Sequence, residues 1–230
     1  MRRAACSGSV AVVMRSRAAI IGLVVLANTQ AGCAAEPDTG DSRVRYVALG
    51  DSYTIGTSVA EAERWPNQLV ERVERLELVA NPAVNGYTSS DLITDELPRL
   101  EMAQPEFVTV LIGVNDVVQG VPDSQYAGNV AVIMEELLTM LPPEGILCIA
   151  TPDYTVTPNG EAFGDPIQQS DAIVRANAIL REACEARGIR FVPEIFELSQ
   201  AARDDRSLVA DDGLHPSGAQ YRRWVDVIAP

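Results

Sequence analysis

The feature that most constrains this chain is an alternation of short apolar runs with longer amphipathic segments from residue 43 onward. Unbroken runs of Val, Leu and Ile are typical of strands covered on both faces, whereas apolar residues that recur every three or four positions are typical of helices. This order predicts parallel strands joined by right-handed helical crossovers. The sequence therefore predicts an α/β fold, a three-layer α/β/α sandwich with a five-stranded parallel sheet.

The boundaries of these elements follow from Gly, Pro and Asn residues between the runs. Strands are predicted over 44–49, 78–84, 107–112, 146–150 and 189–192. Helices are predicted over 66–76, 90–100, 124–141, 167–187 and 217–228. Ser89 or Ser90 is expected to cap the second helix. The longest irregular piece, 151–166, is long for a compact domain and is a candidate wall of a substrate site.

The first 42 residues are not expected to belong to the fold. Arg15 and Arg17 precede a short apolar run, and small residues then lead to Cys33. This pattern is typical of a secretory signal, and the run is much shorter than the roughly 20 residues of a membrane-spanning helix. We predict a signal peptide over 1–33, a flexible tether over 34–42 and a single folded domain over 43–230.

Two interpretations of the signal's end stay open. Ala31-Gly32-Cys33 resembles the end of a bacterial lipobox, although Gln30 stands where Leu is usual. The protein is therefore expected either to be secreted or to be attached to the cell envelope through a lipid on Cys33. That lipid is the one membrane contact that we expect. Translation from Met1 and from Met14 also both fit the sequence.

The charge of the chain excludes one class of partner. All 18 basic residues are Arg, and the chain has 32 acidic residues. Four of the Arg residues lie within residues 1–33, which contain no acidic residue. The remainder has 18 − 4 = 14 Arg and a net charge of 14 − 32 = −18. Because such a surface repels polyphosphate, we expect no nucleic-acid partner. We expect a monomer.

Cysteine and histidine usage argues against a metal site. Cys148 lies in an apolar run and Cys184 on a predicted helix, and we favour two buried thiols over a disulfide between them. There is no CxxC pattern, and the chain has one His. We therefore predict no zinc site and no cofactor.

Polar groups follow the predicted strands at positions where they can meet. They are Gly50-Asp51-Ser52, Asn85-Gly86, Gly113-Val114-Asn115-Asp116 and Asp212-Gly213-Leu214-His215. Each pattern alone is more often a plain turn or a helix cap than a site. Because the carboxyl ends of parallel strands share one edge of a sheet, we expect the four groups to converge there.

Three of these residues suit nucleophilic catalysis. A serine hydroxyl needs a base within hydrogen-bond reach, and His215 is the only imidazole available to Ser52. An imidazole needs an acidic partner that fixes its tautomer, and Asp212, three residues earlier, can reach His215 through a short turn. Asp211 is a rival for that role. We predict Ser52, Asp212 and His215 as the catalytic set.

Acyl transfer also needs donors for the oxyanion of its tetrahedral intermediate. The backbone N–H groups of Ser52 and Gly86 and the side-chain amide of Asn115 can supply them. Gly at position 86 also lets backbone approach the substrate closely. Asp51 and Asp116 flank the site, and we expect them to hold its loops.

Together these four groups resemble the blocks of the SGNH, or GDSL-type, hydrolase family, over residues 46–221. The family's four invariant positions would be Ser52, Gly86, Asn115 and His215. The resemblance implies a flavodoxin-like sandwich, a Ser-His-Asp catalytic set, an ester substrate and no metal. The bacterial lysophospholipase-like esterase branch is the most similar, through residues 50–56 and Arg64-Trp65-Pro66.

The expected function is an exported serine esterase that acts on a small-molecule, lipid or sugar acyl ester. Two alternatives remain open. One is carbohydrate deacetylation or thioester cleavage by the same residues. The other is a secreted ligand-binding protein that keeps this fold without turnover. The absence of a GxSxG motif argues against an α/β-hydrolase.

Overall fold

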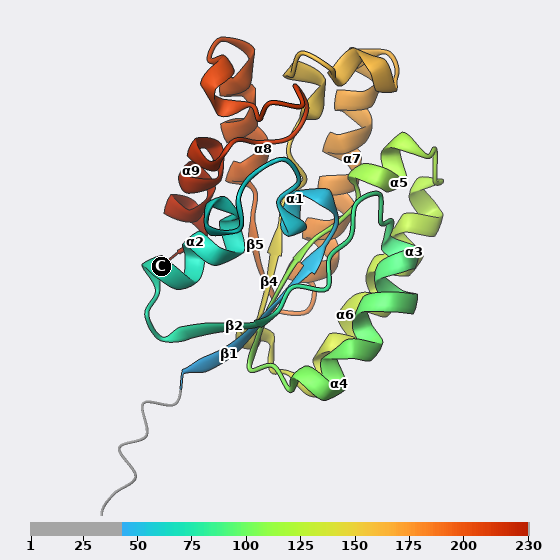
Figure 1. Ribbon diagram of the computed structural model, residues 1–230. Helices are drawn as coiled ribbons and strands as arrows, with labels where there is room; N and C mark the ends of the chain where they lie inside the picture. Colours follow the sequence, from blue (N-terminus) through green and yellow to red (C-terminus); the bar gives the residue numbers. More distant parts are fainter. Residues whose placement is uncertain (1–42, 230) are drawn as a thin grey trace, which may run out of the picture. The chain divides into compact units, whose positions relative to one another are not determined.

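The computed structural model describes residues 43–229, and the signal segment, Cys33 and tether predicted over 1–42 lie outside the described residues. Its centre is a five-stranded, entirely parallel sheet with the order β2-β1-β3-β4-β5 (Figure 1). The strands are β1 (Val44–Gly50), β2 (Leu76–Ala80), β3 (Phe107–Leu111), β4 (Ile146–Ile149) and β5 (Arg190–Val192). The predicted parallel sheet is confirmed. β2 ends earlier than predicted, just before Asn81-Pro82, because proline has no N–H for a strand ladder.

Helices connect the strands and cover both faces of the sheet (Figure 1). They are α1 (Ser52–Ile55), α2 (Trp65–Arg72), α3 (Ser89–Asp91), α4 (Leu100–Ala103), α5 (Val114–Val118), α6 (Asp123–Met140), α7 (Pro166–Glu185), α8 (Glu194–Ser199) and α9 (Gly218–Ile228). The short helices α5 and α8 were not predicted, since five or six residues show little periodicity. Within residues 43–229, no helix has the length and apolarity needed to cross a membrane.

Two separate cores hold the layers together, one on each face of the sheet. Alternate residues of β1 show the division, since Tyr46 and Ala48 pack into the core shared with α2 and α9. Val47 and Leu49 pack into the other core, which is shared with α6 and α7. All four β1 residues are fully buried. The central strands are therefore covered on both faces, as their unbroken apolar runs predict.

The helical segment after β2 differs from the regular helix predicted over 90–100. It begins with α3, continues as a π-helical turn over Leu92–Glu96 and a 3-10 turn over Leu97–Arg99, and ends with α4. Pro98 explains the irregularity, because it cannot donate the N–H that a regular α-helix needs at this position. Within this segment the side chain of Glu96 is fully buried, on the same side as the buried Leu92 and Leu100.

The predicted cap of this segment is also wrong. Thr88, rather than Ser89 or Ser90, is the N-cap: its side chain accepts from the N–H of Asp91, whose carboxylate accepts from the Thr88 N–H at 2.8 Å. This reciprocal pair is a capping box. Ser89 is instead fully buried, and its hydroxyl donates to the carboxylate of Asp116.

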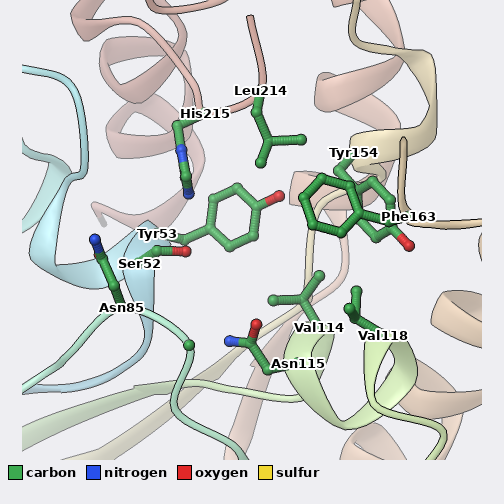
Figure 2. A pocket seen from close by; sticks show the side chains of 11 residues that line it. Ser52, Tyr53, Asn85, Val114, Asn115, Val118, Tyr154, Phe163, Leu214 and His215 are labelled. Carbon is green, nitrogen blue, oxygen red and sulfur yellow. The ribbon is translucent and has the colours of Figure 1, made fainter. Parts of the chain in front are cut away.

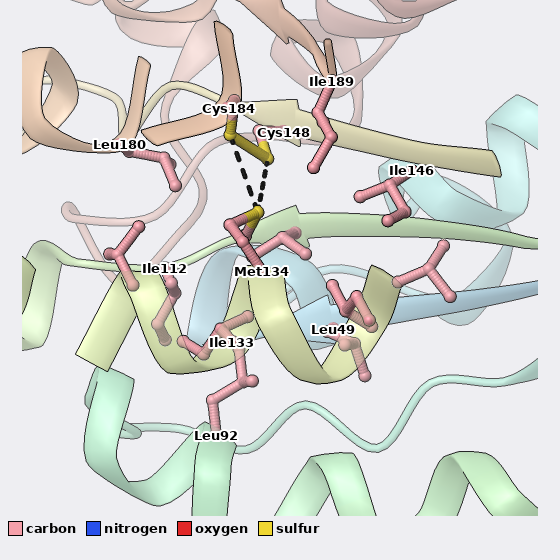
Figure 3. Packing of buried hydrophobic residues seen from close by; sticks show 14 of the residues in the cluster. Leu49, Leu92, Ile112, Ile133, Met134, Ile146, Cys148, Leu180, Cys184 and Ile189 are labelled. Carbon is pink, nitrogen blue, oxygen red and sulfur yellow. Dashed lines mark hydrogen bonds between the residues drawn. A yellow bond between two sulfur atoms is a disulfide. The ribbon is translucent and has the colours of Figure 1, made fainter. Parts of the chain in front are cut away.

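The prediction of two free thiols is wrong, because Cys148 and Cys184 form a disulfide between β4 and α7 (Figure 3). Their Cα atoms lie 6.9 Å apart, and both side chains are fully buried in the core beneath α6 and α7. The thioether sulfur of Met134 contacts both cysteine sulfurs, at 3.7 and 3.8 Å. The sequence could not show this pairing, since it arises from the packing of α7 against the sheet.

Replacing Cys148 and Cys184 together by alanine is expected to lower the free energy of unfolding by roughly 3 kcal/mol, because the disulfide closes a loop with a sequence separation of 36 residues. Urea unfolding of the oxidised protein and of the variant measures the difference. Reduced wild-type protein serves as the control and should lose a similar amount. A wild-type unfolding midpoint that does not respond to reductant would contradict the disulfide.

Candidate active site

The first site residue, Ser52, is positioned by a sharp turn at the end of β1. Gly50 has φ +153°, and a Cβ at this position would lie 2.3 Å from the carbonyl oxygen of Leu111 on the neighbouring strand β3. Only glycine therefore fits where β1 turns into α1. Asp51 caps α1 by accepting from the N–H of Tyr53 at 2.9 Å. Ser52 is then the first residue of the helix, and it is 8% exposed.

His215 and Asp212 form a close pair on the loop before α9. His215 Nδ1 lies 2.6 Å from Asp212 Oδ2. Asp212 Oδ1 accepts from the backbone N–H groups of Leu214 and His215, at 2.9 Å each. Partial burial by itself would raise the pKa of the Asp212 carboxyl, but these hydrogen bonds, together with one from Ser58, lower it to about 2. Asp212 is therefore ionised at neutral pH.

This turn does not directly follow β5, because α8 and two 3-10 turns intervene. It nevertheless returns to the same edge of the sheet. Its neighbour Asp211, the rival candidate, is exposed and has no hydrogen bond to the imidazole among the described residues. The ring of Tyr53 lies 5.6 Å from the His215 ring and supports it from α1.

A cavity of about 190 Å³ lies at the carboxyl end of the sheet (Figure 2). Four predicted residues line it together: Ser52, Gly86, Asn115 and His215. In Figure 2 the His215 ring points toward Ser52. Within the described part of the chain, no hydrogen bond joins Ser52 Oγ to the ring, and such contacts are often longer before substrate binds. The other lining residues are Tyr53, Asn85, Val114, Val118, Tyr154, Phe163 and Leu214.

Three N–H donors are available at this cavity. Gly86 has φ +84°, and no atom lies within 4 Å of where its Cβ would stand, so its backbone is open to a ligand. Among residues 43–229, the N–H groups of Ser52 and Gly86 meet no protein acceptor. Asn115 donates one amide hydrogen to the carbonyl oxygen of Tyr87 at 2.9 Å, which fixes the amide and leaves its second hydrogen free.

The two flanking acids hold loops, as predicted. Besides capping α1, Asp51 is fully buried beneath the Ser52 turn. Asp116 accepts from both the N–H and the hydroxyl of Ser89, at 2.9 and 2.6 Å. Because Ser89 directly follows the segment that carries Gly86, this contact ties that segment to α5.

The predicted wall segment, 151–166, reaches the cavity through Tyr154 and Phe163. It also contacts the turn that carries the imidazole. The side-chain amide of Asn159 donates to the carbonyl oxygen of Asp212 at 2.6 Å, and its backbone N–H donates to that of Gly213 at 2.9 Å. One segment therefore shapes the cavity and supports the Asp212 turn.

Three residues near the site were missed by sequence reasoning: Ser58, Glu96 and Asn159. The Ser58 hydroxyl donates to the Asp212 carboxylate, and the Asn159 side-chain amide donates to the Asp212 carbonyl oxygen. Both bonds join residues far apart in the sequence, and no local pattern indicates Ser58 or Asn159. Glu96 carried a usable signal, since it is an acid between apolar residues on a predicted helix face. Within residues 43–229, no cluster of three or more His, Cys, Asp or Glu side chains is arranged to hold a metal ion.

Comparisons with solved structures agree with this architecture. The crystal structure of TesA superposes with a TM-score of 0.61 at 19% identity, covering 80% of this chain and 94% of the other. A variant of Axe2, an acetyl xylan esterase from Geobacillus stearothermophilus, gives 0.63 at 16% identity, covering 81% and 93%. A lipase/acylhydrolase from Enterococcus faecalis gives 0.61 at 18% identity, covering 80% and 92%. At these identities the likeness shows a shared fold.

The sequence itself shows the family. No curated protein matches this chain. The sequence profile of the GDSL-like lipase/acylhydrolase family matches residues 48–223, a range that includes all four motif groups. The chain therefore belongs to the GDSL-like lipase/acylhydrolase family of ester hydrolases.

Proposed function

We propose that this protein is an exported serine esterase in which Ser52 is the nucleophile, His215 the general base and Asp212 the acid that orients it. The observation that carries the proposal is the cavity, where Ser52, His215, Gly86 and Asn115 meet although they come from four separate parts of the chain. The export part rests on the sequence of residues 1–33.

The first half-reaction follows from the placement of these groups. Asp212 engages His215 Nδ1, which leaves Nε2 to take the proton of Ser52 as the hydroxyl oxygen bonds to the ester carbonyl carbon. The carbonyl electron pair moves onto oxygen, where the N–H groups of Ser52 and Gly86 and the Asn115 amide stabilise the negative charge. When the intermediate collapses, the alcohol oxygen leaves with the proton from His215.

The second half-reaction repeats these steps with water. His215 removes a proton from water, the resulting oxygen attacks the acyl carbon, and Ser52 leaves with the returned proton. The same donors stabilise the second oxyanion. The products are a carboxylic acid and the free enzyme.

The cavity supports a short, uncharged acyl group as the substrate. Its volume of about 190 Å³ lies below the roughly 300–1,000 Å³ of cavities that hold drug-sized ligands. Among the described residues that line it there is no Asp, Glu, Lys or Arg, and Val114, Val118 and Leu214 give it an apolar wall. These features favour acetyl to butyryl esters.

A fluorophosphonate probe tests the proposal directly. Ser52 Oγ should bond to phosphorus and displace fluoride in the full-length protein, and the adduct should appear on the peptide that contains Ser52 by mass spectrometry. We expect no labelling of Ser52→Ala. Ser90→Ala, which removes a nearby exposed hydroxyl, is the matched control and should label like the wild type.

Hydrolysis of p-nitrophenyl acetate, butyrate and palmitate, beside acetylated xylan and an acyl thioester, then separates the alternatives within the enzyme class. Labelling without any turnover would favour the ligand-binding alternative. Failure of the wild type to label would reject Ser52 as the nucleophile.

A further inference from the structure

Ser58 has a backbone conformation that serine rarely adopts. Its φ is +67°, and among residues 43–229 the only other non-glycine residue with positive φ is Gln104. Gln104 caps the end of α4, where left-handed residues are common. Ser58 has no such explanation, since Gly56 already caps α1. A left-handed serine costs on the order of 1–2 kcal/mol, so the surrounding structure must hold it there.

The contact that accompanies this conformation is a hydrogen bond to the proposed catalytic acid. Ser58 Oγ donates to Asp212 Oδ2 at 2.6 Å, across 154 positions of sequence. The same oxygen lies 2.6 Å from His215 Nδ1. The other carboxylate oxygen accepts two N–H groups from the Asp212 turn itself. In the described part of the chain, Ser58 is thus the only partner of this carboxylate from outside residues 212–215.

The position of Ser58 makes this bond a link between two parts of the site. Ser58 follows the helix that begins with Ser52, and the N–H groups of Gly56 and Thr57 both donate to the Ser52 carbonyl oxygen, at 3.1 and 3.0 Å. The segment 52–58 is therefore compact. Through its last residue it holds the carboxylate that orients His215.

We propose that Ser58 is a positioning residue, whose hydroxyl fixes the Asp212 carboxylate against His215 and so joins the nucleophile segment to the base turn. The inference rests on the proposed function, since it assigns Asp212 and His215 the roles given there. Ser58 does not line the cavity, so it acts through Asp212 rather than on substrate.

Two substitutions separate the hydroxyl from the backbone conformation. Ser58→Gly removes the hydroxyl but suits a left-handed backbone, so we expect the melting temperature to stay the same or rise while kcat falls about tenfold, with KM unchanged. Ser58→Thr keeps the hydroxyl but places a β-branched residue at positive φ. It should lower the melting temperature while kcat stays within about threefold of wild type.

A purely structural role would give the opposite order, since activity would then follow stability. Ser207→Ala is the matched control, because Ser207 Oγ donates to Asp205 at the same distance of 2.6 Å and does not line the cavity. We expect it to leave kcat unchanged.

Nuclear magnetic resonance of the single imidazole gives a readout that does not need turnover. The chain has one His, so the Nδ1 proton of His215 is identified without ambiguity. Its exchange with water should be faster in Ser58→Gly than in wild type or Ser58→Thr, because the carboxylate is less firmly held. Wild-type kcat together with unchanged exchange in Ser58→Gly would overturn the inference. A wild type that neither labels nor hydrolyses esters would instead reject the proposed function, and the exchange measurement would still test the link.

Discussion

Replacing His215 by alanine is expected to lower kcat by about 10⁴–10⁶, the range found when the base of a Ser-His-Asp set is removed. The chain has only one His, so no other imidazole can take the Ser52 proton. The ring is also held in place, by Asp212 at 2.6 Å and by the Tyr53 ring at 5.6 Å. Initial rates with p-nitrophenyl butyrate, at equal concentrations of folded protein, measure the loss.

The acid beside it gives a matched pair of variants. Asp212→Asn should lower kcat by about 10⁴, because the neutral amide leaves the imidazole in the wrong tautomer. Asp211→Asn should stay within about threefold of wild type, since this side chain is exposed and, within residues 43–229, forms no hydrogen bond with the ring. If His215→Ala kept more than a tenth of the wild-type kcat, the imidazole would not be the base.

The second large effect concerns stability and involves the buried carboxyl of Glu96. Glu96 Oε2 accepts from the N–H of Gly50 at 2.9 Å, directly behind the Ser52 turn. Among the described residues, its second oxygen Oε1 has no partner, and neither has Oδ2 of the fully buried Asp51. Burial raises the pKa of Glu96 to about 8 and that of Asp51 to about 7. The negative charge of a neighbouring acid contributes to each raised pKa, from Asp51 for Glu96 and from Asp116 for Asp51.

The direction of the pH dependence follows from this raised pKa. An unfolded Glu loses its proton near pH 4.3, whereas folded Glu96 keeps it until about pH 8. Between these values the folded state binds more protons, so the free energy of unfolding decreases as pH rises, by up to ~1.4 kcal/mol per pH unit. Glu96→Gln removes this contribution and keeps an acceptor for Gly50. The free energy of unfolding, measured in urea, should therefore fall between pH 5 and pH 8 by a few kcal/mol less in the variant than in the wild type.

The exposed neighbour Asp95 provides the control, because Asp95→Asn changes the same formal charge on the same segment without altering the buried carboxyl. It should keep the wild-type pH dependence. Equal slopes in wild type and Glu96→Gln would show that Glu96 is already ionised at pH 5 in the folded protein.

Sequence patterns were sufficient for the sheet and for the four motif groups. The run at 107–112 predicted β3 because its Val and Leu side chains are buried on both faces, and the strand ends placed Ser52, Gly86 and Asn115 at one edge. His215 could be assigned to the same edge as the chain's only imidazole. In each case a local pattern and a general rule of parallel sheets were enough.

Features that depend on contacts between distant segments could not be predicted. The disulfide partner of Cys148 is set by how α7 packs on β4, and the bond from Ser58 to Asp212 spans 154 positions. The apolar residues around Glu96 indicated a buried side chain, but its bond to the N–H of Gly50 spans 46 positions and could not be predicted. The sequence gives the residue types for such contacts but not the distances.

The two bonds of Asn159 to the Asp212 turn have a consequence for how acyl preference could diverge. The segment that contributes Tyr154 and Phe163 to the cavity also supports the backbone on which the imidazole is mounted. Exchanging this segment for one from a homologue would therefore alter turnover along with selectivity, unless the graft retained an amide at position 159. Libraries aimed at new acyl groups are better confined to the side chains of Val118 and Phe163, because both line the cavity and, within residues 43–229, neither forms a hydrogen bond with the Asp212 turn.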